Sequence, residues 1–429
     1  MKFFRSGIGL ATLLCVLAVG GIGGWLFYKV RSLPVTLRSE MSWEDALRYQ
    51  NVLGLEMSSA EKRARVHRAV SRMTDDVERE FPLLKIEFRS IPEDRNGFLQ
   101  LYRFAKKYDT SDPVFAGLKE FTGQNGSSWD AEKAKRWLEE NATLVEEIER
   151  IAVMKDRSLS GMPDDYAGFL GGGVVYAANA MIVKARLAAD AKDEERSLHW
   201  IGAAQNIASH LRETEAPTLL AETMNVLIDQ NIHRVVFEDL LPAFGRDADL
   251  TKWRSVLAVR NYNPEELSKV IRGEWYTMSR VFFPLLLAQG SDELPDPENF
   301  LKCYASLVHD RMSWLEGASL VQLRDLEMLD EGKIKGVSKK GRELMTIAAT
   351  GAKPWMNGYC TVAPGIASYR AAMDLLILEK QEGALSKESP KAVTLEPLSG
   401  VPFVLDVDKR QLLPPATGEE YPEALQLPW

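Results

Sequence analysis

Apolar residues recur every three or four positions along most of this chain, the spacing that places them on one face of an α-helix. The pattern is clearest between Gly171 and Leu241. It predicts helices over residues 174–189 and 198–211 and a third helix that follows Pro217 and ends at Leu241, before Pro242. The first two are joined by the polar turn DAKDEER, and the second carries alanines on its packing side. This arrangement is typical of one tetratricopeptide-like helical hairpin, but no regular repetition elsewhere indicates a repeat array.

Other amphipathic stretches extend the helical prediction over most of the chain. Their ends are marked by capping residues, prolines and glycines, and they cover residues 42–53, 58–80, 91–108, 129–153, 250–259, 264–287, 297–315, 339–349 and 364–382. Residues 84–88 are predicted to form either a short strand or an extended link. We therefore expect a mainly α fold with an irregular multi-helix body.

The C-terminal tail departs from this pattern. A Pro-Leu-Ser-Gly turn leads into residues 401–407, where one side of an extended strand is uniformly apolar and the other is mixed. A polar tip and a second short run follow, which predicts a β-hairpin. An isolated two-stranded hairpin is marginal in water, so we expect this one to cover the last helix near residues 367–378, with Phe403 buried. The alternative is a strand edge that binds a partner.

The N-terminus carries the longest apolar segment. Lys2 and Arg5 precede it, and no charge follows until Lys29. As a helix, residues 6–28 would span about 34 Å, enough to cross a bilayer core of roughly 30 Å. We predict a single transmembrane anchor. The alternative is a cleaved signal peptide with its apolar region at residues 8–19.

Two details of this segment bear on the membrane prediction. Trp25, Phe27 and Tyr28 lie at its far end, where an aromatic belt is expected. Gly20 and Gly24 form a G-x-x-x-G pair, a weak signal for helix dimerisation.

The predicted segments follow from these patterns. They are a basic N-terminus (1–5), the transmembrane anchor (6–28), a juxtamembrane segment (29–57), an N-terminal helical region (58–245), a C-terminal helical region (246–383) and the tail with its β-hairpin (384–429).

Basic residues on both sides of the anchor do not decide its orientation. Long domains are translocated largely regardless of charge, and a short basic N-terminus before an apolar run is the usual export signal. We therefore predict a single-pass protein of the inner (cytoplasmic) membrane with an extracytoplasmic body. In that oxidising compartment Cys303 and Cys360 could pair or stay buried as thiols.

Composition narrows the choice of partners. The hydrophobic content of 45% allows a sizeable core, and the net charge of −8 argues against nucleic acid as a partner. Basic residues gather between Lys62 and Arg72, where they indicate either contact with anionic lipid headgroups or a solvated face balanced by the acidic residues that follow.

Candidate chemistry is sparse. No two of the five histidines lie three or four residues apart, the spacing of a helical metal site; they are His67, His199, His210, His233 and His309. The glycine-rich run at residues 168–175 lacks the Lys-Ser/Thr ending of a phosphate-binding loop and predicts a flexible helix entry. We predict no cofactor and no metal site, and we assign no catalytic residue.

Paired carboxylates have a structural explanation. Asp164–Asp165 and Glu265–Glu266 are predicted at helix starts, where negative charge complements the helix dipole. The run Arg272-Gly273-Glu274-Trp275 places opposite charges inside an apolar helix, which favours a buried structural Arg–Glu pair.

Several stretches together are similar to a known family; they are IPEDRNGFLQLYRFA, WLEENATLVEEIERIA, SHLRETEAPTLLAETM, IRGEW and EPLSGVPFVLD. The chain resembles a family of uncharacterised bacterial envelope proteins. In that family a single membrane helix precedes a helical body, and an Asp-Pro-Phe-Ser-Gly-x-Pro turn opens a closing hairpin. Here Glu396 and Leu398 replace the family's aspartate and phenylalanine, and the residues after Leu413 differ from its Tyr-Ser-x-Gly ending. The resemblance implies architecture and compartment but no reaction.

Three functions remain open from the sequence. The first is a membrane-anchored scaffold or adaptor that binds an envelope protein partner. The second is an enzyme whose site is assembled from distant residues. The third is an accessory component of a secretion or pilus-like machine; the glutamate that pseudopilins carry early in their apolar helix is missing between Lys2 and Lys29.

Overall fold

A computed structural model of the chain describes residues 60–108, 113–121, 129–162, 173–257, 264–284, 287, 296–319, 322–325, 337–415 and 424–429. The predicted anchor at residues 6–28 and the predicted helix at residues 42–53 lie outside the described residues. None of the helices in these ranges combines the length and the apolar character that a bilayer crossing requires.

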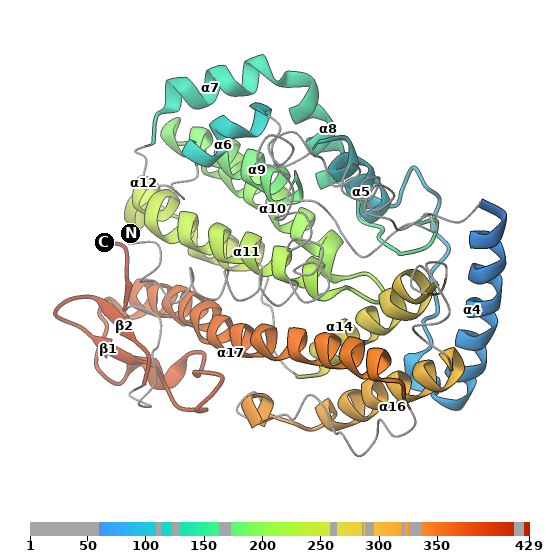
Figure 1. The fold of residues 1–429 in the computed structure, drawn as a ribbon. Coiled ribbons are helices and arrows are strands. Elements are labelled where there is room, and N and C mark those ends of the chain that lie inside the picture. The colour runs from blue at the N-terminus through green and yellow to red at the C-terminus, as the bar shows by residue number, and fades with distance from the viewer. Residues whose placement is uncertain are drawn as a thin grey trace, which may run out of the picture.

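The described residues form mainly α-helices with a small antiparallel sheet at the C-terminus, as predicted (Figure 1). The helices are α4 (Ala60–Glu80), α5 (Gly97–Lys107), α6 (Ala116–Phe121), α7 (Ala131–Glu140), α8 (Ala142–Ala152), α9 (Gly173–Asp190), α10 (Glu194–Arg212), α11 (Leu219–Val235), α12 (Leu241–Phe244), α13 (Leu250–Val256), α14 (Pro264–Thr277), α16 (Pro297–Leu315) and α17 (Lys339–Glu382).

Shorter elements complete the body. The π-helical turns are η4 (Val236–Leu240) and η6 (Met278–Phe282). The 3-10 turns are η2 (Pro82–Leu84), η3 (Pro113–Phe115), η5 (Gly245–Asp247), η8 (Gln322–Asp325) and η10 (Ser389–Ala392). The strands are β1 (Val404–Asp406), β2 (Gln411–Leu413) and β3 (Leu425–Gln426), in the order β1-β2-β3.

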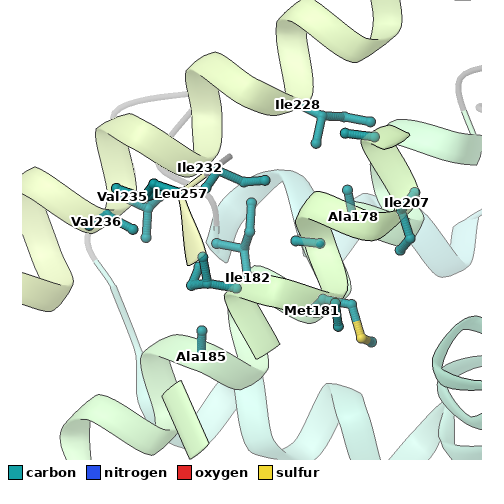
Figure 2. Packing of buried hydrophobic residues seen from close by; sticks show 14 of the residues in the cluster. Ala178, Met181, Ile182, Ala185, Ile207, Ile228, Ile232, Val235, Val236 and Leu257 are labelled. Carbon is teal, nitrogen blue, oxygen red and sulfur yellow. The ribbon is translucent and has the colours of Figure 1, made fainter. Parts of the chain in front are cut away.

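Helices α9, α10 and α11 form the centre of the molecule. Helix α9 is buried along almost its whole length, and small side chains such as Ala178 and Ala185 let its neighbours approach closely. Figure 2 shows Ile182 of α9 and Ile232 of α11 within this packing. Burying one such aliphatic side chain contributes roughly 1.5–3 kcal/mol, so this three-helix contact accounts for a large part of the core.

The buried apolar side chains fall into two clusters. The first cluster draws on residues 98–257, on residues 371–376 of α17 and on residues 403–427 of the tail. The second cluster draws on residues 70–84, on Val226 and on residues 267–366. Helix α17 contributes to both clusters, and α14 packs against α11 where the two meet.

At two places a π-helical turn carries the helical path into a proline. We predicted a helix end before Pro242, but a π-helical turn precedes it and the helical path continues as α12. The backbone N–H of Leu241 bonds to the carbonyl of Val236, five residues earlier. The same arrangement precedes Pro284, after η6. A wider turn eases the clash between a proline ring and the preceding carbonyls.

Two of the predicted helices have different bounds for local reasons. Helix α5 begins at Gly97 and not near Pro92, because the side chain of Asn96 accepts the N–H of Leu99 and caps the helix. The single helix predicted over residues 129–153 is divided into α7 and α8 at Asn141. The amide of Asn141 donates to the carbonyl of Trp137 at 2.8 Å, a side-chain bond that competes with the helix.

The last helix is longer than predicted. We expected two helices, over residues 339–349 and 364–382, but α17 is continuous through Pro354 and Pro364. It ends at Glu382, where Gly383 adopts the left-handed conformation (φ 86°) typical of a helix C-terminus. Of the two alternatives predicted for residues 84–88, the structure has the extended link: residues 85–88 have no strand partner among the described residues.

Candidate functional site

The C-terminal tail is held firmly on the end of α17. The guanidinium of Arg410 donates two hydrogen bonds to the carboxylate of Glu379, both at 2.8 Å. Such paired bonds fix orientation as well as distance, and the bond from Arg410 lowers the pKa of Glu379. Thr394 donates to Asp374 of the same helix at 3.2 Å. The tail therefore covers the last helix, as the sequence predicted.

Apolar burial supports this position. Phe403, Leu405, Leu412 and Leu427 are buried in the first cluster, together with residues 371–376 of α17. Strand β1 pairs antiparallel with β2, with Leu405 opposite Leu412. The predicted two-stranded hairpin is thus extended by β3, which pairs with the other edge of β2.

The Glu-Pro-Leu-Ser-Gly turn is built around a buried carboxylate. Glu396 is fully buried, and its two side-chain oxygens accept the backbone N–H groups of Leu398 at 2.9 Å and Ser399 at 2.6 Å. Its backbone accepts the N–H of Gly400, which has φ 69°, and its own N–H donates to Val401. The side chain of Glu396 therefore orders the turn, and the role of Glu396 is structural.

The opposite side of the tail exposes apolar side chains. Leu395, Val401 and Val404 are 46%, 43% and 51% exposed. Leu395 pairs with Pro402 in an isolated bridge, which brings the three residues into one small region. Strand β1 lies at one edge of the described sheet. We name Leu395, Val401 and Val404 the tail surface; clustered exposed apolar residues typically mark interaction sites.

A second candidate lies where α14 meets α11, at the Arg-Gly-Glu-Trp run. The predicted Arg272–Glu274 pair is not formed, because side chains two residues apart on a helix do not face each other. Instead the carboxyl group of Glu274 accepts the N–H of Leu219, at the start of α11, at 2.7 Å. Burial raises the pKa of Glu274 to about 7.

The neighbouring Trp275 connects this region to α4. Its indole N–H donates to Glu78 at 3.1 Å, and Glu78 also accepts a hydrogen bond from Arg280 at 2.9 Å. The indole ring stacks on Tyr304 of α16, with ring centroids 6.0 Å apart. Burial raises the pKa of Tyr304. These contacts hold α4 against α14 and α16.

The histidines are not brought together. His199 is exposed beside Trp200, and His309 lies against Phe81. His210 and His233 are buried and hydrogen-bonded to backbone carbonyl oxygens, and burial lowers the pKa of both. The side chain of His67 lies outside the described residues.

Other groups singled out from the sequence have structural roles or fall outside the described ranges. Glu266 lies in the first turns of α14, as predicted, and pairs with Lys269. Cys303 and Cys360 form no disulfide. Residues 163–172, including Asp164–Asp165 and most of the glycine-rich run, are outside the described residues. No group of three histidine, cysteine or acidic side chains in the described ranges lies close enough to hold a metal ion.

A shallow pocket of about 330 Å³ lies between α13 and the end of α17. Its lining includes Asp249, Thr251 and Lys380, and the ammonium group of Lys380 already donates to the carbonyl of Ala248 at 2.9 Å.

The fold and these two regions define a helical protein with a docked C-terminal sheet. No family model matches the chain, and no curated protein or solved structure matches it either.

Proposed function

We propose that the chain is a scaffold or adaptor, anchored in the inner membrane by residues 6–28 with its body outside the cytoplasm. It binds an extended segment of another envelope protein at the tail surface. The observation that carries the proposal is the exposure of Leu395, Val401 and Val404 on a sheet that is otherwise fixed to α17.

The position of the tail supports protein binding. In Figure 1 the strands lie at the opposite end of the molecule from α4, the first described helix after the predicted anchor. A partner strand added to the edge of β1 gains backbone hydrogen bonds, while the exposed valines supply apolar contacts. Because the tail is already ordered, binding costs little conformational entropy.

The finer architectural predictions belong to this proposal. The close packing of α9 against α10, with alanines at their contact, supports a tetratricopeptide-like hairpin. The closing turn and sheet support the resemblance to bacterial membrane-anchored envelope proteins. Fusing a phosphatase active only after export, or a fluorescent protein active only in the cytoplasm, to the C-terminus tests the orientation. Fluorescence without phosphatase activity would overturn it.

The binding proposal is tested by site-specific photocrosslinking of the full-length protein in membranes. A photoreactive residue at Val404 should capture one defined protein, and the aspartate variant of Val401 should abolish that product. Val153 is the matched control because it is 63% exposed but lies at the end of α8, outside the tail. Equal capture from Val153, or capture that Val401→Asp leaves unchanged, refutes the tail surface as the site.

A further inference from the structure

Two arginine residues are buried among the described residues. Arg186 of α9 is 8% exposed and Arg311 of α16 is 7% exposed. Arg186 has a counter-charge, because its guanidinium pairs with the carboxylate of Asp239 at 3.2 Å and donates to the carbonyl of Phe121 at 2.7 Å. Burying a charged group is costly unless the group is paired and hydrogen-bonded. Arg186 meets that requirement within the described residues, and Arg311 does not.

Arg311 lies at the centre of the packed face of α16. Its neighbours on that face are apolar and buried; they are Leu307, Val308, Met312 and Leu315. Within the described part of the chain, the guanidinium of Arg311 forms no hydrogen bond and no ion pair. The apolar neighbours therefore surround a cation that they cannot neutralise.

The titratable groups closest to Arg311 along α16 provide no counter-charge either. Tyr304, two turns earlier on the same face, acts on it electrostatically. Burial raises the pKa of Tyr304, so the phenol stays neutral. The adjacent Asp310 is directed to His309, 3.8 Å away. Burial lowers the pKa of Arg311, but a guanidinium keeps its charge at any physiological pH.

The guanidinium of Arg311 keeps a narrow opening to solvent. None of its nitrogen atoms is among the fully enclosed side-chain atoms that lack a hydrogen-bond partner. Since these nitrogens have no partner among the described residues, they must reach solvent. With only 7% of the residue exposed, the opening is too small for a protein segment and fits a small ion.

We propose that Arg311 binds a small oxyanion, a carboxylate or phosphate group, within the packed face of α16. The planar guanidinium matches both groups, because two parallel N–H bonds meet two oxygen atoms. The bound oxyanion supplies the missing counter-charge, and the apolar surroundings strengthen the attraction by excluding water. The stacking of Trp275 on Tyr304 holds α14 against this face. The site is separate from the tail surface, so neither proposal depends on the other.

Ligand-dependent stability of the full-length protein in nonionic detergent tests the site. The probes are inorganic phosphate and acetate, each added at constant ionic strength with chloride as the reference. A ligand that binds only the folded state raises the urea midpoint progressively as its concentration exceeds the dissociation constant. We expect the midpoint to rise between about 1 and about 100 mM of at least one probe. The more effective probe identifies the group that is bound.

Two arginine variants of matched burial separate binding from a structural role. Arg311→Met removes the unpaired charge and keeps a long side chain, so it should raise the midpoint without probe and abolish the response to both probes. Arg186→Met leaves Asp239 without its partner, so it should lower the midpoint and keep the response. If Arg186→Met does not fold, Arg234→Met replaces it, because Arg234 is paired with Glu238 and partly exposed.

The unsubstituted protein and Arg311→Met decide the proposal. It is overturned if neither probe raises the midpoint of the unsubstituted protein, or if chloride reproduces the rise. It is also overturned if the response persists in Arg311→Met. A lower midpoint or loss of folding in Arg311→Met without probe overturns it as well, because Arg311 would then stabilise the unliganded protein as Arg186 does.

Discussion

Phe403 provides the most direct test of how the tail is held. Its side chain is only 3% exposed and lies in the first cluster with Leu405, Leu412 and the second half of α17. Truncating a buried phenylalanine to alanine costs about 3–5 kcal/mol, through lost apolar burial and the cavity that remains. Because the tail lies at the edge of the body and can partly relax, we expect the lower value, about 3 kcal/mol.

The neighbouring residue supplies the control. Val404 is adjacent in sequence but 51% exposed on the opposite side of β1. Val404→Ala should therefore change stability by no more than about 0.5 kcal/mol. Urea unfolding of the full-length protein in detergent, followed by far-ultraviolet circular dichroism, gives the free energy of unfolding of both variants under one set of conditions.

The comparison between the two variants decides the outcome. A midpoint unchanged by Phe403→Ala would show that the tail contributes nothing to the folded body, and the docked position would be wrong. Equal losses in both variants would show that burial is not the cause. A small early transition in Phe403→Ala alone would mean that the tail unfolds separately, contrary to a single cooperative unit.

Three further outcomes can be measured by the same unfolding method. Arg410→Lys should cost about 1 kcal/mol, because an ammonium group cannot form both bonds to Glu379; no loss would show the pair to be energetically neutral. Gly273→Ala should destabilise by about 1–3 kcal/mol, since its Cβ would lie 2.2 Å from a backbone carbonyl oxygen. Gly365→Ala, whose Cβ meets nothing within 4 Å, should instead stabilise α17 by up to about 1 kcal/mol; the reverse order contradicts the packing. Finally, burial lowers the pKa of His210 from 6.5 to about 4, so its contribution to stability is complete above pH 6.5 and is lost as the pH falls toward 4. That loss amounts to roughly 3 kcal/mol; His210→Gln should show a stability that falls correspondingly less over this range, and an unchanged slope would contradict the assignment.

The sequence by itself determined the elements whose signals are local. Helix α16 begins at Pro297 and ends at Leu315, as predicted, because Asp296 caps it and proline suits the first turn. The alternation in the tail correctly placed Phe403 and Leu405 on the buried face, since side chains along a strand alternate between its two faces. Val401 was predicted on the same face but is 43% exposed, because it precedes the start of β1 at Val404. Such features depend on neighbouring residues, which a single sequence displays.

Tertiary structure decided the features that depend on distant residues. Local rules predicted a break between residues 349 and 364, yet α17 is continuous and contributes to both buried clusters; burial outweighs the few kcal/mol that an internal proline costs. The same holds for the candidate sites. Arg410 and Glu379 lie 31 positions apart in the sequence. Glu274 lies 55 positions from Leu219, whose backbone N–H donates to its carboxyl group. Periodicity identifies which face of a helix is buried, but only the packed fold determines which groups meet there and how far burial moves their pKa values.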